Sequence, residues 1–65
     1  MNEQNEVVGS NRFLKARDVQ QQLNVSRALV YRLIETGNLR AVRINHAIRV
    51  RQSDLYKYIQ EHLTI

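Results

Sequence analysis

Apolar residues recur at helical spacing in three parts of the chain. The three stripes are Ala16, Val19 and Leu23; then Val30, Leu33 and Ile34; then Leu55, Tyr58, Ile59 and Leu63. Residues spaced by three, four or seven positions share one face of an α-helix, and a surface helix buries that face against the rest of its domain. The pattern therefore predicts three amphipathic helices.

The ends of these helices can be placed from single residues. Asn24 tolerates a left-handed backbone and ends the first helix, which begins at about Ala16. Ser26 can cap the second helix through its hydroxyl oxygen. Gly37 is expected to end that helix, because glycine adopts a positive φ without strain. Ser53 is the expected cap of the third helix. The first two helices are thus separated by a tight turn.

Between the second and third helices the apolar period changes to two. Apolar and arginine residues alternate there in the order Val42, Arg43, Ile44 and then Ile48, Arg49, Val50, Arg51. Asn45 and His46 lie between the two runs, which predicts two antiparallel strands joined by a short turn. The alternation leads us to expect Arg43, Arg49 and Arg51 together on the outer face of this hairpin.

Residues 1–11 are polar and show no apolar period. We expect a flexible N-terminal tail over residues 1–11 and one folded domain over residues 12–65. The expected order of elements in that domain is helix, helix, hairpin, helix, which is an α+β architecture.

Positive charge is concentrated in the middle of the chain. The formal net charge is +4, and residues 27–51 alone hold six arginines against Glu35, a net charge of +5. Such a field suits a polyanion, because contacts to phosphates release counterions. A solvated charged surface is the alternative, but alternation with apolar residues on ordered elements favours a polyanion. A basic amphipathic helix entered through a tight turn is shaped for the DNA major groove.

The composition argues against several other functions. There is no cysteine, and two histidines, His46 and His62, do not make a metal site, which needs several ligands. Paired carboxylates, a glycine loop for phosphates and a nucleophile with a base are not evident, so we expect no enzyme and no cofactor. No apolar run approaches membrane-spanning length, and no signal-peptide pattern is present. We expect a cytoplasmic protein, associated with the nucleoid when bound to DNA, and no membrane partner.

Taken together, these elements resemble the small winged helix-turn-helix domains of the excisionase and MerR-like group. The matching segments are 23–26, 30–34, 37–39, 42–44, 48–50 and 54–55, within roughly Phe13 to Leu63. The resemblance implies a helix-turn-helix, a two-stranded antiparallel wing and a C-terminal helix. It also implies that the second helix enters the major groove and that the wing lies along the backbone or an adjacent minor groove.

The resemblance also assigns site residues. It places Ser26, Arg27, Ala28, Tyr31 and Arg32 on the recognition helix, and Arg43 and Arg49 on the wing. With Arg51, these are the residues expected to bind DNA. Two questions stay open at this point. Of Arg27 and Arg32, one can face bases and the other a phosphate, or either can pair with Glu35 or Asp18. Tyr31 can donate to a phosphate or cover the edge of the core.

Four positions depart from the family pattern. Gln20 stands where alanine is usual, and Ala47 stands where a basic residue is frequent in the wing. Lys15 replaces a serine or threonine cap, for which Asp18 near the positive end of the helix partly compensates. Asn45–His46 replaces a Gly-Gly turn. We expect the largest deviation from the family where the first two helices cross.

The expected function is sequence-specific binding of double-stranded DNA as an excisionase-type recombination directionality factor. Such a protein bends DNA and assists an integrase in excising a mobile element. The short chain, with no effector domain after the third helix, favours this interpretation. One helix and one wing offer limited contact area, so further copies of the protein are expected to bind cooperatively. The alternative is a small transcriptional repressor or activator at a promoter. A protein-interaction module is a third, less favoured hypothesis.

Overall fold

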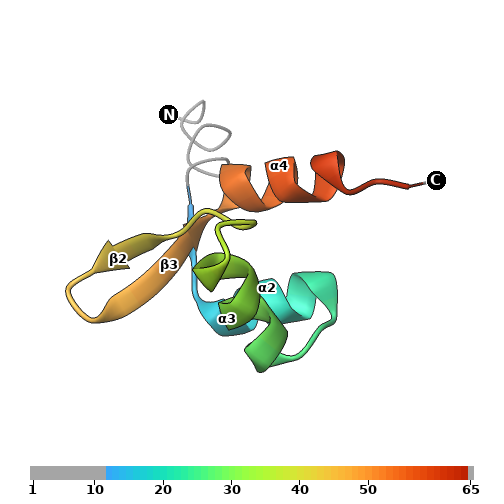
Figure 1. The fold of residues 1–65 in the computed structure, drawn as a ribbon. Helices are drawn as coiled ribbons and strands as arrows, with labels where there is room; N and C mark the ends of the chain where they lie inside the picture. Colours follow the sequence, from blue (N-terminus) through green and yellow to red (C-terminus); the bar gives the residue numbers. More distant parts are fainter. Residues whose placement is uncertain (1–11, 65) are drawn as a thin grey trace.

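The computed structural model describes residues 12–64. Its elements are β1 (Phe13–Leu14), α2 (Ala16–Leu23), α3 (Arg27–Glu35), β2 (Val42–Ile44), β3 (Ala47–Arg51) and α4 (Gln52–Glu61). The strands form an antiparallel sheet in the order β1-β3-β2. Helices α2 and α3 lie together below the sheet, the β2–β3 wing reaches away from them, and α4 leaves from the end of β3 (Figure 1). This is the predicted α+β winged helix-turn-helix. The tail expected over residues 1–11 lies outside the described residues.

The first helix has the predicted bounds although its cap is weak. The Lys15 side chain makes no capping hydrogen bond. Instead, the backbone N–H of Lys15 donates to Oδ2 of Asp18 at 2.9 Å, which is half of a capping box. Asn24 ends the helix in the left-handed conformation, with φ of 57°. The carboxylate at position 18 therefore fixes the start of α2 by a direct hydrogen bond.

The second helix also begins and ends where the sequence predicts. Oγ of Ser26 accepts a hydrogen bond from the backbone N–H of Leu29 at 3.2 Å. Gly37 follows the helix with φ of 81°, a conformation that glycine adopts without strain. In the turn between the helices, the backbone N–H of Val25 donates to the carbonyl of Gln20 at 3.2 Å. The side chain of Gln20 is half-buried.

The core is small and draws on almost every element. Within residues 12–64, six side chains are at most 2% exposed: Leu14, Val19, Val30, Leu39, Val50 and Leu55. Tyr58 and Ile59 of α4 pack against this cluster, whereas Leu63 of the predicted stripe lies beyond the helix and is 61% exposed. With so few buried residues, each one carries a large share of the stability of the domain.

The pairing of the wing strands corrects one prediction. The turn at residues 45–46 has only two residues, and the resulting pairs are Ile44 with Ala47, Arg43 with Ile48, and Val42 with Arg49. Directly paired residues project from the same face of a sheet. Arg43 therefore shares a face with Ile48, whereas Arg49 and Arg51 project from the opposite face. The expectation that the three arginines share one face is wrong. The length of the turn sets which residues of the two strands pair, and so which side chains project from the same face.

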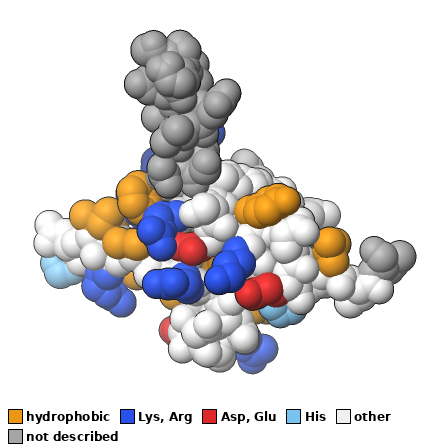
Figure 2. Space-filling view, turned by 90° about the horizontal axis from the view of Figure 1, so that it is seen from above, with side chains coloured by type: hydrophobic (Ala, Val, Ile, Leu, Met, Phe, Trp, Pro, Cys, Tyr) orange, Lys and Arg blue, Asp and Glu red, His pale blue; other side chains and the backbone are white. Residues whose placement is uncertain are grey.

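The opposite face of the sheet is only partly covered in the described part of the chain. Phe13 and Ile44 project from it and are each 50% exposed. Seen from the side away from α2 and α3, hydrophobic side chains gather at the wing end, next to basic ones (Figure 2). This face contributes nothing to the core, which lies on the side of Leu14 and Val50.

The third predicted helix starts earlier than expected. Arg51 occupies the cap position, so the prediction that Ser53 caps α4 is wrong. The reason is tertiary: the backbone N–H of Gln52 donates to the carbonyl of Arg12 at 2.8 Å, which carries the β1–β3 pairing to the first residue of α4. Nε of Arg51 then donates to Oδ2 of Asp54 at 2.9 Å. Strand β3 thus passes into the helix without a loop.

Replacing Val30 with alanine should destabilise the domain by about 1–3 kcal/mol, because this fully buried side chain joins α3 to the core. The measurement is urea unfolding followed by circular dichroism. Arg32→Ala on the exposed side of the same helix is the control, and its unfolding midpoint should stay within error of the wild type. Equal midpoints for Val30→Ala and the wild type would contradict the assigned core.

Candidate nucleic-acid interface

One side of α3 is free of the core. Val30 is buried, and Leu33 and Ile34 pack against the core, so the helix turns its other residues outward. Of the five recognition positions that the sequence predicts, four are exposed and one, Tyr31, is half-buried: Ser26, Arg27, Ala28, Tyr31 and Arg32. The structure therefore brings these five predicted site residues together on one helix and its cap.

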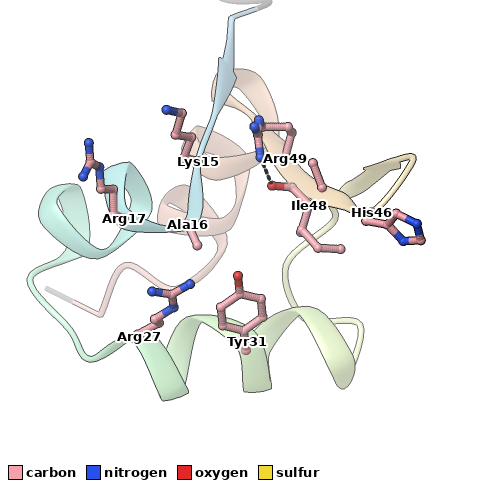
Figure 3. A pocket seen from close by; sticks show the side chains of 9 residues that line it. Lys15, Ala16, Arg17, Arg27, Tyr31, His46, Ile48 and Arg49 are labelled. Atoms are coloured by element: carbon pink, nitrogen blue, oxygen red, sulfur yellow. Dashed lines mark hydrogen bonds between the residues drawn. The ribbon is translucent and has the colours of Figure 1, made fainter.

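A cavity of about 380 Å³ opens between α3, the start of α2 and the wing. We call it the basic cleft. Nine residues line it; four of them are basic and none is acidic. The basic residues are Lys15, Arg17, Arg27 and Arg49. Figure 3 shows their side chains around the opening, together with Tyr31 and Ile48. Cations held together around a concave surface attract an extended anion such as a nucleic-acid backbone.

Arg27 is held in the cleft by its neighbour on the helix. Its guanidinium carbon lies 5.6 Å from the centre of the Tyr31 ring, within the range of a cation–π contact. The hydroxyl of Tyr31 points into the cleft from below (Figure 3). Within residues 12–64 the structure has a single ion pair, formed by Arg51 and Asp54. Among these residues, neither Arg27 nor Arg32 forms an ion pair with Glu35 or Asp18, so that alternative is not what the structure shows.

Arg49 lines the cleft at the wing, although its side chain leaves β3 on the face opposite the core. Its Nη1 donates to the carbonyl of Ile48 at 2.9 Å, which holds the guanidinium back along β3 (Figure 3). The pairing of Leu14 with Val50 brings Lys15 next to this position at the end of β1. Lys15, at the cap of α2, and Arg49, on β3, thus both line the cleft.

The other two arginines of the predicted hairpin are placed differently. Arg51 is paired with Asp54 at 2.9 Å, and their side chains are 40% and 12% exposed. This pair holds the junction of β3 and α4, and Arg51 does not line the cleft. Arg43 is exposed on the face of the wing that carries Ile48, and it too stays outside the cleft lining.

Sequence reasoning did not single out Lys15 and Arg17, which line the basic cleft. Lys15 stood out only as a poor cap, and Arg17 only as a residue off the apolar stripe of the first helix. Strand β1 has only two residues, too few to show an alternating pattern. The sequence therefore does not predict the β1–β3 pairing that aligns Lys15 with Arg49. An available clue was that both residues are basic and flank the start of the helix.

A second, smaller hollow lies on the other side of α3. It has a volume of about 280 Å³ and is lined by Ser26, Ala28, Leu29 and Arg32. We call it the outer hollow. Leu29 is 37% exposed there, and Arg32 is exposed as well. In contrast to the basic cleft, this surface combines one cation with apolar and hydroxyl groups.

A family model described as a helix-turn-helix domain matches residues 13–63, which run from β1 beyond the end of α4. The chain belongs to this helix-turn-helix family. Neither the curated proteins nor the solved structures gave a match. Helix-turn-helix domains bind DNA, which makes the outward side of α3 and the basic cleft the candidate DNA interface. No helix among the described residues is long and apolar enough to span a membrane.

Arg49→Ala should weaken binding to duplex DNA, because it removes one cation from the basic cleft. The slope of log affinity against log salt should become shallower by about 0.9 if one phosphate contact is lost. Lys57→Ala on α4 is the matched control, since it removes the same charge from an exposed residue outside the cleft. Fluorescence anisotropy with a labelled duplex measures both variants. Equal effects of the two substitutions would contradict the assigned interface.

Proposed function

We propose that this helix-turn-helix protein is an excisionase-type recombination directionality factor. In this role it binds specific sites on double-stranded DNA, bends the DNA and assists an integrase in excising a mobile element. The observation that carries the DNA-binding part is the presence of four cations, from three elements, in a cleft that adjoins the exposed side of α3. The matched family is excisionase-like, which supports the more specific role.

The dimensions of the interface support a major-groove mode of binding. An α-helix with its side chains is about 10–12 Å across and fits the major groove, which is about 12 Å wide. With α3 in the groove, the basic cleft lies beside the helix, where a sugar–phosphate backbone borders the groove. The wing then extends over that backbone, with Arg43 and Arg49 as its basic residues.

The same arrangement favours bent DNA and more than one copy. One short helix and one wing of eight strand residues give little contact area, and smooth bending of a binding site costs of the order of 1–6 kcal/mol. Several copies on neighbouring sites can share that cost, because each bound protein raises the effective concentration of the next. The proposed partners are therefore double-stranded DNA, an integrase and further copies of the chain.

The proposed role is tested on DNA that flanks the gene. We expect footprinting to show several protected sites close together, and the mobility of circularly permuted fragments to show a bend. A reconstituted reaction with the neighbouring integrase should yield excision only when the protein is added. A straight duplex with one isolated site at a promoter would contradict the excisionase role and favour a transcriptional regulator.

A further inference from the structure

We propose that the two arginines on the outward side of α3 have different tasks. Arg27 binds the DNA backbone in the basic cleft, together with Lys15, Arg17 and Arg49. Arg32 reads base edges from the outer hollow, together with Leu29. The proposal rests on the DNA-binding function proposed above, and it names the residues of that surface that decide sequence preference.

The two arginines line different hollows of the surface. They are five residues apart on an α-helix, which places them about 140° apart around the helix axis. Arg27 lines the basic cleft and is absent from the outer hollow, and the reverse holds for Arg32. The helix axis therefore separates the two guanidinium groups into two different surroundings.

The surroundings of Arg27 are those of a backbone contact. Three further cations line the same cavity and no acidic residue does, so the site recognises negative charge rather than a pattern of donors and acceptors. The Tyr31 ring, 5.6 Å away, keeps the guanidinium of Arg27 turned toward the cleft (Figure 3). Contacts to phosphates position a protein on the duplex and carry no direct information about sequence.

The surroundings of Arg32 are those of a base contact. A guanidinium can donate two hydrogen bonds to O6 and N7 of guanine, and apolar groups such as those of Ala28 and Leu29 can contact the methyl group of thymine. Leu29 is 37% exposed beside Arg32, although Val30 and Leu33 next to it on the helix are part of the core or pack against it. An exposed leucine and an arginine in one hollow match the mixed chemistry of a major-groove edge.

The test compares Arg27→Ala and Arg32→Ala on two duplexes of equal length. One duplex carries a site selected by the wild-type protein from a random library, and the other carries the same bases in scrambled order. Arg27→Ala should weaken binding to both by the same factor and make the salt dependence shallower. Arg32→Ala should lower the ratio of the two affinities by about 5- to 150-fold.

Arg27→Lys is the matched control, since it keeps the charge and should retain most of the backbone affinity. Both residues are exposed, and thermal unfolding by circular dichroism checks that the variants fold. A loss of sequence preference in Arg27→Ala, or an unchanged preference in Arg32→Ala, would overturn the division of tasks while leaving DNA binding intact. A wild-type protein that binds neither duplex would instead overturn the proposed function itself.

Discussion

The pairing of β3 with a strand on each side is the interaction on which the rest of the structure depends. On one side, the pairing of Leu14 with Val50 closes the sheet over the core and brings Lys15 to the edge of the basic cleft. On the other side, the register set by the two-residue turn decides which face of the wing each arginine occupies. The same strand passes directly into α4. The core, cleft, wing and last helix are therefore all positioned by one central strand.

How much the sequence predicts depends on whether the determinants are local. The bounds of α2 and α3 follow from apolar spacing and from Asn24 and Ser26, which act within a few residues of the helix ends. The start of α4 does not, because the carbonyl that accepts from Gln52 lies forty residues away, on Arg12. The register of the wing depends on whether the turn has an even or odd number of residues. The alternating pattern of the strands does not give that number. The basic cleft depends on both long-range strand pairing and the register of the wing. The sequence therefore predicted only two of its four cations, Arg27 and Arg49.

The proposed interface divides into parts with different chemistry on a single short helix. The cleft side gathers cations around Arg27, and the other side sets Arg32 beside Leu29. Phosphate contacts give affinity and register on the duplex, while contacts to base edges give preference among sequences. A domain with a small core can carry both because the charged residues lie on its surface, where they do not require burial. In the proposed interface, the fold supplies a frame for two kinds of contact, and helix-turn-helix domains bind DNA.

The most direct test of this account is the salt dependence of binding to duplex DNA. Suppose that the four cations of the basic cleft each neutralise one phosphate. The slope of log affinity against log salt concentration should then be about −3.6 or steeper, since each phosphate contributes about −0.9. The affinity is measured by fluorescence anisotropy between about 50 and 200 mM salt, the range over which such contacts show a clear loss. A steep linear fall is the predicted result. A slope near zero would contradict the claim that this surface binds the DNA backbone.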